Sequence, residues 1–211
     1  TPDAGGPGGK GRYLIAVNSG FGLTFSSKSK AQQTLSVIDL NAKPDPTVIQ
    51  NVYFPSPQSA NFGLVFDPEF QPDGKYRLYL SGGFENKIWI LGFDPKADQP
   101  LSPQNKPDTK FDSPFIDVTA FAENAPSPDY NGEVAAVYPT GLAVSPNGDA
   151  IYAANNLGDT LGIVSDLRST RKISRVDLHR TNPLEHPVMT QEPSIHLDFP
   201  RPPRDLVAAF L

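Results

Sequence analysis

The sequence contains no cysteine, which excludes disulfide bonds, thiolate-ligated zinc and thiol catalysis together. No stretch reaches the roughly 18 consecutive apolar residues that a membrane-spanning helix needs. The first residues, TPDAGGPGGKG, lack the charged start and apolar centre of a signal peptide, so an exported form is expected to have lost its signal already.

Blocks of basic residues are also missing. The chain has 18 Lys and Arg against 23 Asp and Glu, which gives a net charge of -5. Nucleic acid and anionic membrane surfaces attract clustered positive charge. We therefore expect neither as a partner.

Long helices are disfavoured, because 23 prolines and 17 glycines interrupt the 211 residues. The apolar and β-branched residues lie in short runs, which is typical of strands. The one segment that invites a helix, FIDVTAFAENA at 115–125, contains stiff β-branched residues and precedes a proline, so it predicts a strand followed by a loop. The expected class is all-β.

Three hairpin-like stretches recur along the chain. They are LIAVNSGFGLTF continuing to QTLSVIDL, YLSGGFENKIWIL at 79–91 and YAANNLGDTLGIV at 152–164. Aligning their apolar centres gives two columns, which are Leu14, Leu78 and Ile151 before the turn and Leu35, Ile88 and Leu161 after it. A polar insert at 25–33 lengthens the first turn, which a surface hairpin tolerates.

Further strands flank the hairpins. A Gly-Leu strand at Gly63 and another at Gly141 each lead into a turn that ends in Asp-Gly or Asn-Gly, a strong hairpin signal. An apolar segment also follows each hairpin, at 47–54, 115–121 and 172–178. The predicted unit is a meander of four antiparallel strands, although only TPDAGGPGGKG precedes the first copy and it offers no first strand.

Recurring four-stranded sheets are typical of the blades of a β-propeller, which stack face to face. We predict a partial propeller at 1–180, with blades at roughly 10–60, 61–125 and 134–180, and a proline-rich tail or linker at 181–211. Closed propellers usually need about four to eight blades. Three equivalents indicate a piece of a larger propeller or one completed by a second copy. A β-sandwich with coincidental hairpins is the alternative.

The segment GLAVSPNGDAIYAANNLGDTLGIVSDL, supported by GRYLIAVNSG and QTLSVIDL, closely resembles the YVTN-type propeller repeat. Ser145 to Gly148 match the turn of that repeat, Tyr152 to Asn155 its second strand and Thr34 to Asp39 its third. The resemblance covers roughly residues 10 to 180. It implies an exported bacterial protein, secreted or periplasmic, of a kind often joined to a phosphoesterase domain, and more distantly it is similar to lactonase-type propellers.

Polar residues at the hairpin turns are the best candidates for a binding rim, because corresponding turns of a propeller lie on one face. Glycine and asparagine also supply positive φ in tight turns, so a purely structural role is the alternative. The predicted ligand-binding rim consists of Asn18, Ser19, Ser81, Asn86, Asn155, Asn156 and Asp159, with Gly20, Gly82, Gly83 and Gly158 beside them.

Catalytic and metal-binding signals are weak. The three histidines, His179, His186 and His196, lie at spacings that fit no hydrolase motif, and G-x-S-x-G is absent. The resemblance to lactonases implies that oxygen ligands could gather around calcium. Turn carboxylates also bond to their own backbone without any ligand. The candidates are Asp67, Glu69, Asp73, Glu85, Asp159 and Asp166.

Three functions follow as hypotheses. The first is a non-catalytic scaffold that presents its rim to a protein or a small molecule. The second is a lactonase-like or phosphoesterase-associated hydrolase that uses a divalent cation. The third is a structural protein that self-associates through open blade edges.

Overall fold

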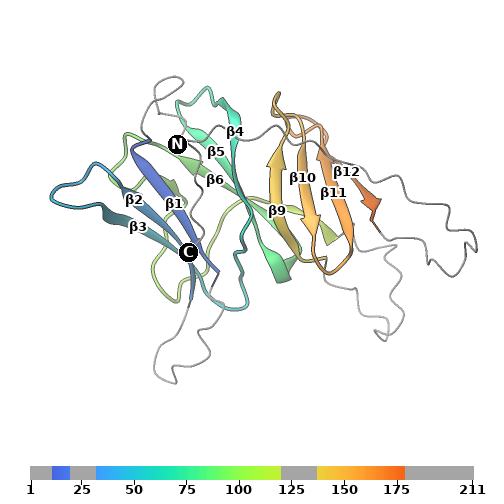
Figure 1. Ribbon diagram of the computed structural model, residues 1–211, viewed down its shortest axis with the longest axis horizontal. Helices are drawn as coiled ribbons and strands as arrows, with labels where there is room; N and C mark the ends of the chain where they lie inside the picture. The colour runs from blue at the N-terminus through green and yellow to red at the C-terminus, as the bar shows by residue number, and fades with distance from the viewer. Residues whose placement is uncertain (1–10, 20–31, 120–136, 179–211) are drawn as a thin grey trace, which may run out of the picture. The chain divides into compact units, whose positions relative to one another are not determined.

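The computed structural model describes residues 11–19, 32–119 and 137–178 (Figure 1). The chain divides into two compact units, Thr1–His179 and Arg180–Leu211, and every described residue belongs to the first. The predicted tail at 181–211 and the three histidines lie outside the described residues. Within those residues, no helix is long and apolar enough to cross a membrane.

The described residues form three antiparallel sheets, which we call blades 1, 2 and 3. Blade 1 contains β1 (Tyr13–Asn18), β2 (Gln33–Asp39) and β3 (Thr47–Phe54). Blade 2 contains β4 (Leu64–Phe70), β5 (Tyr76–Ser81), β6 (Lys87–Phe93), β7 (Leu101–Ser102) and β8 (Phe115–Asp117), with the short turn of 3-10 helix η2 (Gly83–Glu85) between β5 and β6. Blade 3 contains β9 (Pro139–Val144), β10 (Ile151–Asn155), β11 (Thr160–Ser165) and β12 (Lys172–Asp177).

Each blade is a meander, with neighbouring strands in chain order (Figure 1). The all-β class and the blade architecture are therefore confirmed, and the single sandwich is not what the chain forms. Blade 2 differs in one detail that the sequence does not reveal. Its fourth strand is split, because β7 pairs with one end of β6 and β8 with the other, and a loop at 103–114 leaves the sheet between them.

The strand registers confirm both apolar columns. The last backbone pair before each hairpin turn is Asn18 with Thr34 in blade 1, Gly82 with Lys87 in blade 2 and Asn155 with Thr160 in blade 3. The first column lies four residues before this pair in every blade, where Leu14, Leu78 and Ile151 face Ile38, Leu91 and Val164. The residues of the second column, Leu35, Ile88 and Leu161, come one position after this pair in all three blades. Corresponding positions in the blades can therefore be compared directly.

Two apolar clusters lie between the sheets, one on each face of blade 2. Leu78 and Leu80 of blade 2 pack with Leu35 and Val37 of blade 1. On the opposite face, Tyr79 and Ile88 pack with Ile151, Ala153 and Val164 of blade 3. Alternate residues of a strand point to opposite faces. The continuous apolar runs seen in the sequence are therefore explained by burial of both faces of blade 2.

Blades 2 and 3 come closest at Gly63, just before β4. A Cβ atom there would lie 2.1 Å from the Thr140 carbonyl oxygen and 2.9 Å from the Leu142 amide nitrogen, both in the β9 backbone. Real Cβ contacts do not reach such distances, and a backbone carbonyl cannot rotate away as a side-chain tip can. The innermost strands β4 and β9 can therefore approach this closely only because residue 63 is a glycine, which has no side chain.

The Gly63→Ala variant tests this condition. We expect a loss of about 1–3 kcal/mol in the free energy of unfolding, because the added methyl forces β4 and β9 apart. Urea denaturation measures it. The matched control is Gly92→Ala on β6, where the nearest neighbour of a Cβ would be Ser102 Cβ at 3.8 Å. Equal losses in the two variants would contradict this account of the interface.

Amide side chains hold the split outer edge of blade 2 against blade 1. The Gln50 side chain donates to the Leu101 carbonyl at 2.8 Å and accepts from the Leu101 amide at 2.7 Å. Asn105 makes the same pair of bonds with the Tyr53 backbone, and Gln58 makes it with Phe111. Each amide therefore substitutes for a strand residue and satisfies a backbone donor and acceptor together.

Candidate functional site

The strand ends that lead into the β1–β2, β5–β6 and β10–β11 turns define one edge of the sheets, which we call the rim. Several contacts join them there. The Asn86 side chain accepts hydrogen bonds from the backbone amides of Val137 and Tyr138, which lead into β9. The Gln33 side chain at the start of β2 accepts from the Ala60 amide, which leads toward β4. Each contact therefore joins the hairpin end of one blade to the segment that leads into the first strand of the next blade.

Two of the predicted rim asparagines close their own hairpins. Asn18 donates to Thr34 Oγ1 at 2.8 Å, and Asn155 donates to Thr160 Oγ1 at 3.0 Å. The two pairs occupy the same position, the last pair of the hairpin. Gly82 takes that position in blade 2 and donates its backbone amide to the Lys87 carbonyl. These asparagines stabilise the strand ends.

Other predicted rim residues also serve the fold. Ser81 is fully buried, and its hydroxyl accepts a hydrogen bond from the Gly63 amide. Asn86 adopts a left-handed conformation with a φ of 52°, and Asp159 does so with a φ of 43°. The Ser19 backbone carbonyl accepts a hydrogen bond from the Gln33 side chain. Asn156 is exposed, and its backbone amide donates to the Tyr138 carbonyl. Gly20 lies outside the described residues.

The surface of the rim carries apolar side chains that the sequence pattern did not single out. Phe84 is 67% exposed and Leu157 is 58% exposed. They occupy the same position, two residues after the last strand pair, in the turns of blades 2 and 3. Phe62, also exposed, lies just before β4. A turn that repeats an apolar residue at its tip could have been noticed by aligning the turns as well as the strands.

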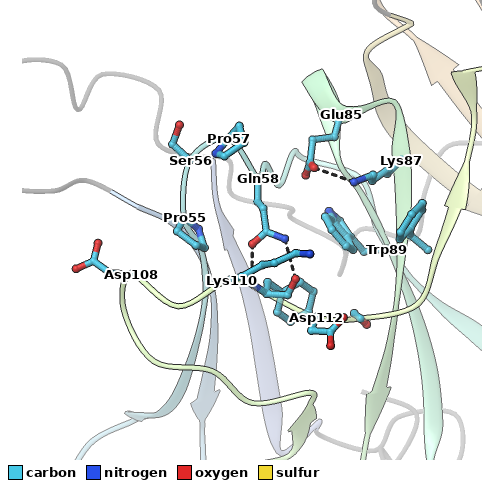
Figure 2. A pocket seen from close by; sticks show the side chains of 13 residues that line it. Pro55, Ser56, Pro57, Gln58, Glu85, Lys87, Trp89, Asp108, Lys110 and Asp112 are labelled. Atoms are coloured by element: carbon cyan, nitrogen blue, oxygen red, sulfur yellow. Dashed lines mark hydrogen bonds and ion pairs between the residues drawn. The ribbon is translucent and has the colours of Figure 1, made fainter.

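A pocket of about 530 Å³ opens at the rim between the link that leaves β3, the start of β6 and the loop that precedes β8 (Figure 2). Its volume is in the range of pockets that hold small ligands. Pro55 and Pro57 come from the link, Lys87 and Trp89 from β6, and Phe115 from β8. None of these residues was predicted as a site residue.

Lys87 is held in place on several sides. Its ammonium nitrogen lies 2.9 Å from Glu85 Oε1, 4.5 Å from the centre of the Phe115 ring and 5.1 Å from that of Trp89. Figure 2 shows this group at one side of the pocket, with Trp89 next to Lys87. A cation on aromatic faces is stabilised by the ring quadrupoles. Glu85 also accepts the Ser59 amide, which ties the link to this turn.

The aromatic wall is partly buried and partly open. Trp89 is only 2% exposed, and its indole nitrogen donates to the Ser59 carbonyl at 2.9 Å. Its ring meets Phe54, Phe111 and Phe115 at angles typical of edge and tilted contacts. Phe115 remains 44% exposed, so it is the ring that a ligand can contact.

The groups that line the pocket are largely engaged with one another or with the backbone. A nucleophile needs a base within hydrogen-bond reach. Among the described lining residues, no serine hydroxyl donates to a carboxylate, and the Ser113 hydroxyl donates to the Ile90 carbonyl. Lys87 is engaged by Glu85 and two rings. The chemistry on offer is an apolar surface bordered by the charged groups of Asp108, Lys110 and Asp112.

The carboxylates considered for calcium do not gather in the part of the chain that the structure describes, which holds no group of three or more His, Asp or Glu suited to a metal ion. Asp67 and Glu69 both face Arg168, at 3.6 Å and 2.7 Å. Glu85 pairs with Lys87 and Asp166 with Lys172. Asp73 accepts the Lys75 amide as a turn residue does, and Asp159 lies in the β10–β11 turn.

Asp67 nevertheless matters to the contact between blades 2 and 3. It is almost fully buried, accepts the Tyr79 hydroxyl at 3.1 Å and faces Arg168 from the turn after β11. Burial raises the pKa of the Tyr79 phenol above its ordinary value, chiefly by removing water from the charged form. The folded state therefore favours the protonated phenol.

This pKa shift predicts an alkaline loss of stability. The contribution of Tyr79 is complete below about pH 10, the unfolded value, and is lost as the pH rises through the folded pKa. In urea unfolding from pH 7 to 11, Tyr79→Phe is expected to show a shallower decline. At pH 7 it should lose about 1–2 kcal/mol, since buried Asp67 loses a donor.

The matched control is Tyr152→Phe, the same position on blade 3, where the ring is 38% exposed. It should stay within about 0.5 kcal/mol of the parent protein at pH 7. A decline with pH that is as steep in Tyr79→Phe as in the parent would contradict the assignment.

Comparison with known proteins finds similarity to solved structures at low sequence identity. Neither family models nor curated proteins match the sequence. Among solved structures, a periplasmic gluconolactonase from Pseudomonas aeruginosa is similar, with 17% identity over 81% of this chain and a TM-score of 0.48. Hydrazine synthase from Kuenenia stuttgartiensis is similar with 14% identity over 79% and a TM-score of 0.43. This chain spans 40% and 47% of those chains, less than half of either.

The sheets and their packing place the chain in the β-propeller class, as a partial propeller. The finer resemblance to the YVTN-type repeat, the blade boundaries and the location outside the cytoplasm stay predictions.

Proposed function

We propose that this chain is a non-catalytic binding scaffold that presents its rim, with the pocket between blades 1 and 2, to a protein or a small molecule. One observation carries the proposal: a half-exposed ring, Phe115, forms the wall of an open pocket whose other main groups, Lys87 and Trp89, are already fixed by partners. A preorganised wall lowers the ordering cost of binding.

The wall also suggests which ligands fit. Phe115 and the two link prolines offer apolar contact, while Lys110 and Asp112 offer one charge of each sign at the border. An apolar ring or chain that carries polar groups on one side would contact both parts. Such groups are common to protein side chains and to small metabolites, and the proposal covers both sources.

Trp89 provides the measurement, because it is the only tryptophan of the chain and it lines the pocket. We expect that screening short aromatic peptides and ring-containing fragments will yield ligands that change its fluorescence. Phe115→Ala should weaken such a ligand about tenfold or more, because it removes the exposed ring.

The control for that experiment is Phe84→Ala, which removes a more exposed ring at the rim but outside the pocket. It should change the affinity less than twofold. If the screen gives no ligand, or if both variants weaken binding alike, the pocket is not the binding site.

The hydrolase hypothesis makes a different prediction. A calcium-dependent lactonase needs a cluster of oxygen ligands, and the described carboxylates are engaged separately. We therefore expect gluconolactone to hydrolyse at the buffer rate with and without calcium, and the melting temperature to be unchanged by calcium. A rate above the buffer rate that disappears with a chelator would favour the hydrolase instead.

A further inference from the structure

The face of each blade that points toward the following blade, which we call its forward face, is built from corresponding positions. Strand registers align Ile15 with Tyr79 and Tyr152, and Leu35 with Ile88 and Leu161. On β9 to β11 of blade 3 the forward face includes Gly141, Ala143, Tyr152, Ala154, Leu161 and Ile163, and β12 adds Lys172, Ser174 and Val176 at its outer edge.

Leu35, Ile88 and Tyr79 are buried on the first two blades and Ile15 is partly buried, whereas the corresponding positions of the third blade are more open. Leu35 and Ile88 are fully buried beneath the next blade, whereas Leu161 is half-buried. Tyr79 is 1% exposed and Tyr152 is 38% exposed. An apolar face of this kind is covered wherever a following blade is present.

Gly141 strengthens the comparison. It is the counterpart of Gly63, because each of the two glycines precedes a leucine that pairs with the residue two positions before the last pair of the hairpin, Leu80 in blade 2 and Ala153 in blade 3. Gly63 is where the next blade's innermost strand touches the backbone, at Thr140. At Gly141 a Cβ would meet nothing nearer than Ala154 Cβ at 3.8 Å, and the residue is exposed. Blade 3 is therefore shaped to receive another sheet.

The opposite face of blade 1, its rear face, is open in the same way. Leu14 is 49% exposed, while its counterparts Leu78 and Ile151 are fully buried against the preceding blade. Ala16, Ser36 and Ile38 share this face with Leu14. The polar groups on it are satisfied internally, because Asn18 donates to Ser36 and Ser36 donates to Asn51.

The charged side chains at the margins of the two faces already have partners, since Lys172 at the outer edge of the forward face pairs with Asp166 and Arg12 beside the rear face pairs with Asp39. Bringing them together would bury apolar area without isolating a charge, which is the costly case. Both contacts between blades within the chain also pack the rear face of one blade on the forward face of the blade before it.

We propose that a second copy of this chain packs the rear face of its blade 1 on the forward face of blade 3. The contact is head to tail, so two copies make it twice and close a ring. The six sheets of two copies fall within the four to eight of closed propellers. This inference does not depend on the binding pocket, which lies between blades 1 and 2 of one chain.

The molar mass in solution, from light scattering after gel filtration, tests the proposal. One chain has a mass of 22.8 kDa, and twice that mass is expected. Ala143→Arg on the forward face and Leu14→Arg on the rear face should each give single chains. Both positions are exposed, so folding should be kept, as circular dichroism can verify. Phe84→Arg, at an exposed ring on the rim of blade 2 and away from both open faces, should leave the dimer intact.

Mixing the two variants provides the sharper result. The intact forward face of Leu14→Arg can accept the intact rear face of Ala143→Arg, while the second contact of the ring brings the two arginines together. The mixture should therefore recover a dimer that neither variant forms alone, held by one contact and weaker than the parent dimer. A single-chain mass for the parent protein at every concentration would overturn the proposal. So would a dimer that Leu14→Arg leaves intact, since the forward faces would then pair with each other, or growth beyond two chains, since the ring would not close.

Discussion

The burial of both faces of a blade by its neighbours is the constraint on which this structure depends. A four-stranded sheet with apolar residues on both sides cannot stay in water alone, because each face must find another apolar layer. Blade 2 meets this condition within the chain, since Leu78 and Leu80 lie against blade 1 and Tyr79 and Ile88 lie against blade 3. The close contact at Gly63 then sets how near the innermost strands come.

The sequence was informative where one residue type has one physical use. The apolar columns through Leu78 and Ile88 could be aligned because a strand buried on both faces has few alternatives. The Asn-Gly turn was readable because Gly148 needs a positive φ, which it has. Both features depend on local backbone geometry, and both are found where they were expected.

The candidate site was harder to predict, because its residues have several possible uses. Asn18 and Asn155 look like surface groups in the sequence, yet each donates to a threonine across its own hairpin. The pocket depends on the loop at 103–114, whose course is fixed by partners about 50 positions earlier in the chain. No local sequence pattern predicts that Gln58 bonds to the Phe111 backbone. Only the tertiary structure brings Phe115, Lys87 and the link prolines together.

The paired hydrogen bonds that Gln50, Asn105 and Gln58 make with the backbone have a consequence for the chemical ageing of the protein. Each of these side-chain amides donates through its NH2 group and accepts through its oxygen, both to the backbone of a single residue. Deamidation of Asn105 or Gln50 would replace the NH2 group by a second carboxylate oxygen, which can only accept. That oxygen would then face a backbone carbonyl. Slow chemical damage to a single side chain would thus weaken one of the ties between the outer edge of blade 2 and blade 1, while Gln58 still held the loop at Phe111.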